Sequence, residues 1–408
     1  MLRFLTAGES HGKALLAIVE GLPAGLTIDF QALTNDLRRR QTGYGRGRRM
    51  AIESDRAEAL SGVRHGETTG GPIALLIPNK DWVNWQRTMQ VDVRGEALGE
   101  GDVPSDTPGA DRPPVTRPRP GHADLAGYVK YGHDDMRDVL ERASARETAA
   151  RVAVGAIARQ LLGALQTEIA SHVTTIGSAS VPDPLAFSFE QVRAILPDAP
   201  LHCADADIEQ RMVAEIDRAR EAGDTMGGSF EVIAHGVPPG LGSYVQWDRK
   251  LDGRLAQALM SIPAIKAVGF GRGPAVASLP GSRVHDEIVA RPSAVSRLAV
   301  SRLTNNAGGL EGGVTNGEDL RVTAYMKPIS TLMRPLRSVD LATMTESPAT
   351  IERSDVCAVP AAAVVGEAMV AFVLADAVVE KFGGDSMVEL LANWSAFLRR
   401  TSERFVRR

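Results

Sequence analysis

Two glycine-flanked segments carry histidines that could exchange a proton with a ligand. His11 stands in Gly8-Glu9-Ser10-His11-Gly12, where the glycines let another group approach the backbone. An imidazole with a pKa of about 6.5 gains or loses a proton near neutral pH, so His11 is a candidate acid–base catalyst. The alternative is a structural or solvated loop histidine. Two more histidines, His122 and His133, precede an arginine-flanked helix start.

A basic segment follows further along the chain. Six arginines lie between Arg38 and Arg49, and no acidic residue occurs between Leu37 and Ile52. Interspersed glycines predict a loop that a ligand can approach closely. Guanidinium groups bind phosphate and carboxylate with two parallel hydrogen bonds, so the segment suits a small polyanion. The alternative is a solvated basic turn; because the chain as a whole is acidic, we favour an anion clamp.

A predicted helix near residue 144 organises these groups. Ser144 and Glu147 form a Ser-x-x-Glu pattern, which predicts a capping box at the helix start. Arg142 and Arg146 flank the first turn, so the helix N-terminus and two guanidinium groups form a candidate anion site. The alternative is that both arginines only solvate the helix end. Small apolar residues at helical spacing predict a deeply buried helix: Ala149, Val152, Ala153, Ala156, Ile157 and Leu161.

The remaining chain predicts a mixture of strands and helices. Apolar runs at 2–7 and 14–20 predict strands, and residues 52–77 predict strands alternating with turns. Helices are expected over 31–40, 206–222, 251–261 and 358–379. The segment at about 90–118 is acidic and then proline-rich, which predicts an irregular, exposed excursion rather than a domain linker.

Three later segments carry groups suited to binding or catalysis. Four glycines lie between Gly308 and Gly313, where backbone amides could face a phosphate. Lys327 to Thr331 places a cation and two hydroxyls in a proline-stiffened turn. Asp355 precedes the last apolar run, and taken alone its position favours a helix cap.

Composition limits the classes of protein to consider. The chain has 408 residues, 44% of them hydrophobic, and a formal net charge of −4, which does not favour nucleic acid or an anionic membrane as a partner. Two cysteines provide neither a disulfide framework nor metal-ligand spacing, and we expect no metal and a cytoplasmic location. No signal peptide is expected, and Glu367 and Asp376 interrupt the apolar run 358–379, which favours a core helix over a membrane span. Length alone suggests two or three domains.

Taken together, these stretches resemble the chorismate synthase family. The matching motifs span nearly the whole chain in family order: GESHG at 8–12, RRRQTGYGRG at 38–47, RPGHADLAGYVKYG at 119–132, ERASARETAARVAVGAIA at 141–158, GDTMGG at 223–228, GVPPGLGS at 236–243, NNAGGLEGG at 305–313, MKPIST at 326–331 and RSDVCAVPAA at 353–362. The resemblance implies a single α+β domain over 1–408, in which antiparallel β-sheets sandwich central helices. It also implies a homotetramer, assembled as a dimer of dimers.

The activity that the resemblance implies is an anti-1,4-elimination of phosphate from 5-enolpyruvylshikimate 3-phosphate, which gives chorismate, the precursor of the aromatic amino acids. The family requires reduced FMN although the reaction has no net redox change. A flavin that transiently donates an electron and then takes up the hydrogen explains this, because the proton lost sits on a weakly acidic carbon. NADPH enters only if the chain reduces its own flavin; otherwise a separate flavin reductase is the expected partner.

The resemblance also implies roles for individual residues. His11 would protonate the departing phosphate, His122 would protonate the reduced flavin, and Asp355 would relay a proton with Ser10 and Ser144. The substrate would be held by Arg40, Arg46 and Arg49, of which Arg40 and Arg46 match the NADPH-binding arginines of two-function members. The FMN contacts would be Arg142, Ala143, Ser144, Pro263, Ala264, Gly312, Lys327, Pro328, Ile329, Ser330, Thr331 and Arg353.

Four positions depart from the family pattern: Ala267, Gly269, Arg272 and Asn306. They put the local detail of the flavin pocket in question but leave both histidines in place. Two rival functions remain at this stage. One is a non-enzymatic binder of nucleic acid or of a phosphorylated ligand through the 38–49 arginines, and the other is a plain flavin reductase that turns over FMN with NAD(P)H.

Overall fold

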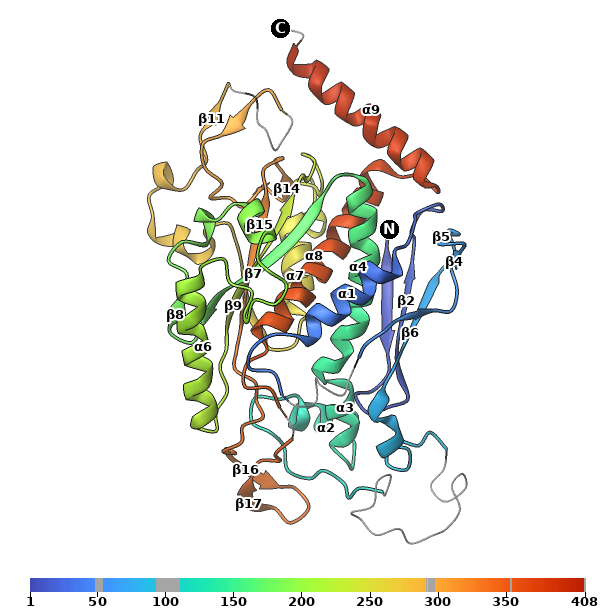
Figure 1. The fold of residues 1–408 in the computed structure, drawn as a ribbon, viewed down its shortest axis with the longest axis vertical. Helices are drawn as coiled ribbons and strands as arrows, with labels where there is room; N and C mark the ends of the chain where they lie inside the picture. Colours follow the sequence, from blue (N-terminus) through green and yellow to red (C-terminus); the bar gives the residue numbers. More distant parts are fainter. Residues whose placement is uncertain (48–53, 93–110, 291, 293–297, 353, 407–408) are drawn as a thin grey trace.

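The computed structural model describes residues 1–47, 54–92, 111–290, 292, 298–352 and 354–406. These residues combine α-helices with antiparallel sheets, which confirms the mixed α+β class. Figure 1 shows two main sheets with a group of helices between them.

The first sheet comes from the N-terminal part of the chain. Its strands pair in the order β1-β2-β6-β3, all antiparallel, with bounds Arg3–Ala7 (β1), Ala14–Glu20 (β2), Glu58–Ala59 (β3) and Ile73–Pro78 (β6). Along β2, Leu15, Ala17 and Val19 are buried, whereas Leu16 and Ile18 are exposed. One face therefore packs on the core, and the opposite face presents apolar side chains to solvent.

The second sheet is covered more completely. Its antiparallel order is β10-β15-β9-β7-β8, with bounds Glu168–Ile176 (β7), Ala179–Ser180 (β8), Gly228–His235 (β9), Ile265–Phe270 (β10) and Leu320–Met326 (β15). Residues of β7 and β9 are mostly buried on both faces, including Glu231 and His172. The buried Glu231 accepts hydrogen bonds from Arg321 at 2.6 and 3.0 Å, which satisfies its charge inside the protein.

Two helices occupy the space between the sheets. The helix α4 (Thr148–Ala164) contacts β2 and β6, and α8 (Val359–Phe382) contacts β7 and β9. They pack closely on each other because Gly155 has no side chain; a Cβ atom there would lie 2.3 Å from the Cβ of Ala368. The alanine-rich helix predicted from the sequence is deeply buried, as expected.

Further helices surround this centre. They are α1 (Phe30–Gln41), α2 (Asp124–Tyr131), α3 (Arg137–Arg142), α5 (Phe189–Arg193), α6 (Ala206–Glu221), α7 (Leu251–Met260) and α9 (Met387–Val406), which projects from the body near the C-terminus in Figure 1. Short hairpins complete the described chain: β4 (Val63–Arg64) with β5 (Glu67–Thr68), β11 (Ile288–Val289) with β12 (Ser301–Arg302), β13 (Leu310–Glu311) with β14 (Val314–Thr315), and β16 (Arg337–Asp340) with β17 (Thr345–Pro348).

Of the two hydrogen bonds in the predicted capping box, the one from the Ser144 side chain is present and the one from the Glu147 side chain is wrong. The Ser144 hydroxyl accepts a hydrogen bond from the Arg146 amide, but it caps a short 3₁₀ turn, η3 (Ala145–Glu147), and α4 begins only at Thr148. The Glu147 carboxylate instead accepts from Thr6 and Arg151. Tertiary contacts with β1 and the next helical turn have replaced the local reciprocal bond.

The helix α8 is long and apolar enough to cross a membrane, but most of it is buried inside the protein. It carries a charged network in the core. Glu367 accepts hydrogen bonds from Arg39 at 2.7 and 2.8 Å, from Arg159 at 2.6 Å and from Ser171 at 2.7 Å. Burial alone would raise the pKa of Glu367, but the two guanidinium groups outweigh burial and lower its pKa from 4.5 to about 2.

We expect Glu367→Gln to lower the free energy of unfolding by about 1–3 kcal/mol at neutral pH, because the half-buried Arg39 and Arg159 lose the buried carboxylate that they share and keep only Asp36 as a counter-charge. The native pKa lies below the unfolded value of 4.5, so this stabilisation is complete above that pH and is lost as the pH falls toward 2. Urea titrations at neutral and acidic pH measure both effects.

Glu380→Gln on the same helix is the matched control. Glu380 pairs with Arg249 and Arg254, but its side chain is more than a third exposed. Its loss should cost less than about 1 kcal/mol. Equal effects of the two substitutions would contradict the assignment of a special role to the buried network.

Candidate functional site

The first candidate catalyst, His11, lies in the loop between β1 and β2. Its Nδ1 atom is 2.7 Å from Oε1 of Glu141, and its backbone amide donates to Oε2 of the same carboxylate at 2.7 Å. Glu141 is buried in the last turn of α3, and its carbonyl oxygen accepts from the Ser10 amide. The Ser10 and Ser144 hydroxyls are 3.2 Å apart, so this loop also touches the start of η3.

An indole ring covers the His11 imidazole. The rings of His11 and Trp85 stack with centroids 3.9 Å apart and planes inclined by 22°. Trp85 is buried, follows the 3₁₀ turn η2 (Lys80–Asn84), and donates its indole N–H to Asp81. The guanidinium of Arg112 lies over the same indole, 3.7 Å from its centroid. Sequence reasoning named neither Trp85 nor Glu141.

The second histidine belongs to a different network, at the start of α2. His122 Nδ1 is 2.5 Å from Asp124 Oδ1, and Asp124 also accepts from the backbone amide and the side chain of Arg119. Burial alone would raise the pKa of Asp124, but the hydrogen bonds from His122 and Arg119 and their positive charge hold this pKa well below its usual value. Both the Asp124 carboxylate and Arg119 Nη2, at 3.0 Å, therefore contact His122 Nδ1.

The same network reaches the turn at 327–331. Arg119 donates to the buried hydroxyl of Thr331 at 3.1 Å, and the ammonium group of Lys327 donates to the Gly121 carbonyl at 2.5 Å. The Lys327 amide in turn bonds to the carbonyl of Ala264. Burial lowers the pKa of Lys327, and the positive charge of Lys266 adds to this effect. His122, Lys327, Thr331 and Ala264, all named from the resemblance, thus lie in one network of contacts.

The arginine loop forms a third group with Asp355. Arg46 lies 2.7 Å from Asp355 Oδ2, and the Gly47 amide donates to Oδ1 at 2.6 Å. The buried Arg40 donates to the Ala145 carbonyl and the Thr148 hydroxyl at the start of α4. Asp355 is not a helix cap, because the N-cap of α8 is Ala358, which makes no side-chain capping bond.

Burial lowers the pKa of Arg40 to about 10, although Asp55 opposes this change. Asp55 also accepts from the buried Arg146 at 2.7 Å. Arg146 therefore points into the protein rather than solvating a helix end, whereas Arg142 is exposed and bonds to Thr6.

Hydrogen bonds connect the arginine loop to the 327–331 turn. The Val356 amide donates to the Gly45 carbonyl, and the Val356 carbonyl accepts from the Met226 amide. Thr225, next in the chain, donates its hydroxyl to the Ile329 carbonyl in the 327–331 turn. The arginine loop, the Asp355 segment, the 223–228 motif and the 327–331 turn therefore form a continuous series of contacts.

Some predicted site residues lie apart or outside the described chain. Gly312 lies near the N-terminal end of α7, because the carbonyl of the next residue, Gly313, accepts a hydrogen bond from the Leu251 amide. Pro263 and Ala264 instead follow the C-terminal end of that helix. A helix of this length separates the two positions by about 15 Å. Arg49 and Arg353 lie outside the described residues, as does most of the predicted excursion.

The departures from the family pattern form a local group of their own. Arg272 donates to the side-chain oxygen of Asn306 at 2.6 Å, and the backbone amide of Asn306 donates to Asp286. A Cβ atom on Gly269 would come within 3.1 Å of Gly273, so that position is tightly packed. Arg272 and Asn306 are therefore structurally coupled to each other.

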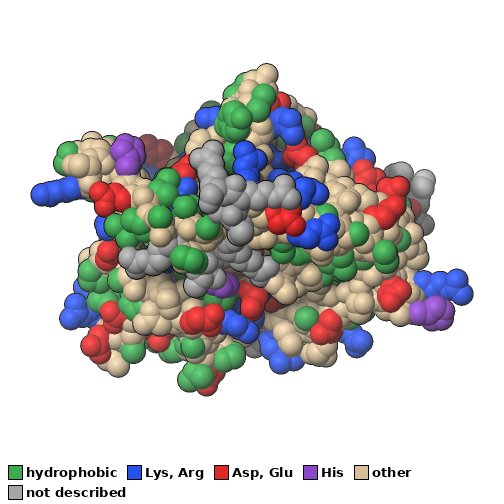
Figure 2. Space-filling view, turned by 90° about the horizontal axis from the view of Figure 1, so that it is seen from above, with side chains coloured by type: hydrophobic (Ala, Val, Ile, Leu, Met, Phe, Trp, Pro, Cys, Tyr) green, Lys and Arg blue, Asp and Glu red, His purple; other side chains and the backbone are tan. Residues whose placement is uncertain are grey.

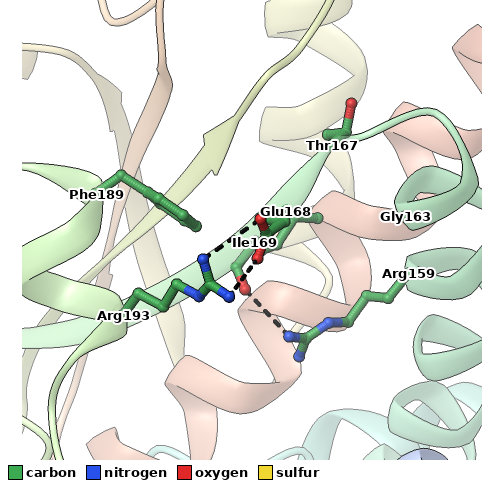
Figure 3. Close-up of a pocket in the computed structure, with 7 residues that line it drawn as sticks. All are labelled: Arg159, Gly163, Thr167, Glu168, Ile169, Phe189 and Arg193. Carbon is green, nitrogen blue, oxygen red and sulfur yellow. Dashed lines mark hydrogen bonds and ion pairs between the residues drawn. The ribbon is translucent and has the colours of Figure 1, made fainter. Parts of the chain in front are cut away.

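A cavity of about 210 Å³ lies away from these groups, where α4 leads into β7 (Figure 3). Two arginines line it, but both are bonded to other groups of the protein. Arg193 pairs with Glu168, and Arg159 donates to Glu367 and to the Ile169 carbonyl. The cavity therefore does not offer free positive charge to a ligand. Within the described ranges, no group of three or more His, Cys, Asp or Glu side chains is arranged to hold a metal ion.

Known proteins match this chain over nearly its full length. The family model for chorismate synthase matches residues 2–379. The chorismate synthase of Geobacter sulfurreducens is 54% identical over 401 residues, and that of Desulforudis audaxviator is 56% identical over 403 residues; both alignments cover 98% of each chain. A crystal structure of chorismate synthase matches with a TM-score of 0.76 and 41% identity, again over 98% of each chain. The chain belongs to the chorismate synthase family of carbon–oxygen lyases.

Proposed function

We propose that this protein eliminates phosphate from 5-enolpyruvylshikimate 3-phosphate to form chorismate, with reduced FMN and no net redox change. The observation that carries the proposal is a set of buried arginines and Asp355 joined by one series of contacts to the turn beside the carboxylate-paired His122, with a second carboxylate-paired histidine, His11, in the loop that contacts Ser144. This donor set matches a small ester that carries a phosphate and two carboxylates.

The charge of the arginine loop supports a polyanionic substrate. Arg40, Arg46 and Arg146 contribute three positive charges, and Asp55 and Asp355 contribute two negative ones. The buried Nη1 of Arg40 makes no hydrogen bond to any described residue and lies 3.6 Å from Asp55. An anion beside this guanidinium would satisfy that donor in a site that excludes water.

The two histidines suit different proton transfers. Glu141 accepts from His11 Nδ1, so Nε2 is the nitrogen left for exchange: the imidazolium form gives its Nε2 proton to the departing phosphate and is left as the neutral Nδ1–H imidazole. His122 shares a network with Thr331 and Lys327, which places its proton beside the predicted flavin-binding turn. Asp355, oriented by Arg46 and Gly47, accepts the proton that remains at the end of the reaction.

The 327–331 turn fits a bound FMN by its chemistry. It combines a desolvated ammonium group with hydroxyls, and the adjacent Gly121 has a φ of +81°, which allows close approach to the backbone. When bound, reduced FMN supplies the transient electron that assists loss of phosphate and of the ring hydrogen. The remaining FMN contacts would be those named from the family. NADPH at Arg40 and Arg46, or a separate reductase, would maintain the reduced flavin.

We further propose a single-domain β–α–β sandwich that assembles as a homotetramer in the cytoplasm. One large buried cluster contains residues of both sheets and of α4 and α8, which supports a single domain. Leu5, Leu16 and Ile18 form an exposed apolar face on the first sheet, and such a face favours burial against another subunit. Both cysteines are buried and unpaired, in keeping with a reducing compartment.

The structure gives little support to a nucleic-acid binder. That hypothesis depends on the 38–49 arginines, of which Arg39 and Arg40 are directed to internal partners and Arg46 to Asp355. On the face shown in Figure 2, acidic and basic described side chains are interspersed. A phosphate backbone needs accessible positive charge, which these arginines do not provide.

The decisive test is an anaerobic assay with enzyme, chemically reduced FMN and 5-enolpyruvylshikimate 3-phosphate. We expect one phosphate and one chorismate for each substrate consumed, with no net flavin oxidation. Steady NADPH consumption with oxidised FMN, without phosphate release from the ester, would instead identify a plain flavin reductase.

His11→Ala and His122→Ala should each lower kcat by about 10²–10⁴-fold, the usual contribution of a positioned proton donor. Circular dichroism should show an intact fold. His133→Ala is the control. His133 is partly exposed, and its Nδ1 atom lies 3.4 Å from Oδ2 of the exposed Asp138, a surface contact. A normal rate in either test variant would remove that histidine from the mechanism.

Asp355→Asn should retain reduced-FMN binding and lower kcat at least about 10²-fold. The asparagine oxygen can still accept from the Gly47 amide, but the side chain can no longer take up a proton or balance Arg46. Flavin titration and single-turnover kinetics separate the two effects; full activity would restrict Asp355 to a structural role.

A further inference from the structure

We infer that Glu141 is a positioning residue that fixes the tautomer of His11, so that Nε2 is the imidazole atom that exchanges a proton with the leaving phosphate. The inference rests on the proposed function for its catalytic consequence, but its structural content can be tested without substrate.

The inference starts from the number of donors that Glu141 satisfies. Its two oxygens accept from one residue: Oε2 from the His11 backbone amide and Oε1 from His11 Nδ1, both at 2.7 Å. A carboxylate has no proton to donate, so Nδ1 must carry the hydrogen in this contact. The neutral imidazole then has its lone pair on Nε2, and no described residue bonds to Nε2.

Burial makes this arrangement strict. The Glu141 side chain is completely inaccessible and that of His11 nearly so, at 0% and 13% exposure. A buried carboxylate oxygen without a donor would be costly, so rotation of the imidazole away from Glu141 is disfavoured. The stacked Trp85 ring adds a second restraint, because it covers one face of the imidazole and is itself held by Asp81.

Glu141 also has a structural contact that must be separated from this role. It bonds to the His11 and Ser10 amides and so anchors the loop between β1 and β2. Loss of the side chain would disturb that loop whether or not the tautomer matters. The test therefore needs a substitution that keeps the shape and a readout that loop anchoring alone would not change.

Glu141→Gln meets this need. Glutamine has one acceptor oxygen and one amide nitrogen that only donates. The backbone N–H of His11 cannot become an acceptor, so the oxygen must face it and the NH₂ group must face Nδ1. Nδ1 must then accept, which moves the imidazole proton to Nε2.

The experiment uses magic-angle-spinning NMR of the ¹⁵N-histidine-labelled full-length protein without substrate, with the His11 signals identified by their loss in His11→Asn. We expect the Nδ1–H tautomer in the unsubstituted protein and the Nε2–H tautomer in Glu141→Gln. Glu147→Gln is the matched control, because its buried carboxylate contacts Thr6 and Arg151 rather than a histidine. It should leave the His11 signals unchanged.

In the anaerobic assay, Glu141→Gln should lower kcat by about 10²-fold, because the proton-donating imidazolium needs Nδ1–H and the glutamine NH₂ group opposes it. KM should change by less than about threefold, since the arginines that bind substrate are untouched. An Nε2–H tautomer in the unsubstituted protein would overturn the inference, even if the variant does not fold. An unchanged tautomer or an unchanged kcat in Glu141→Gln would overturn it too. Absence of phosphate release by the unsubstituted protein would instead contradict the proposed function and leave the tautomer result standing.

Discussion

The structure depends on placing positive charge in the interior beside matched carboxylates. Three consecutive arginines near the end of α1 show how this constraint works. Arg38 is exposed, Arg39 is bound by Glu367 in the core, and Arg40 enters the start of α4 near Asp55. Successive helical positions face different directions, so neighbours in sequence belong to different environments. A guanidinium group can bind a polyanionic ligand only if carboxylates inside the protein do not fully balance its charge. We propose that Arg40 is such a group.

The close approach of α4 and α8 makes the arrangement possible. Gly155 against Ala368, and Gly366 against Phe230, leave no room for larger side chains between the helices and the second sheet. This packing fixes the start of α4, and with it Ser144, Arg146 and Thr148. The beginning of α8 is fixed in the same way, which positions Asp355 just before it. Tight packing at glycine therefore sets the geometry of polar groups at the ends of the two helices.

Much of the fold could be predicted because the relevant signals are local. The sequence pattern predicted α1, α6, α7 and α8 to within a few residues, and short apolar runs predicted β1 and β2. The capping box was wrong because Glu147 finds partners in tertiary structure, which a four-residue pattern does not contain. Glu141 and Trp85 were not predicted for a related reason. Glu141 lies 130 residues from His11 and beside an arginine, so in the sequence it resembles a surface ion pair.

The two histidines use the same device for different purposes. In each, a buried carboxylate contacts Nδ1, although His122 Nε2 also lies 3.4 Å from Arg119 Nη2. Glu141, however, gives both oxygens to His11, and the indole of Trp85 covers the ring. Asp124 instead divides its oxygens between His122 and Arg119, and Arg119 extends to Thr331. His122 is thereby tied to the predicted flavin turn, whereas His11 is held independently of it. The resemblance assigns one histidine to the cofactor and the other to the leaving phosphate, and this difference in connection supports the proposal.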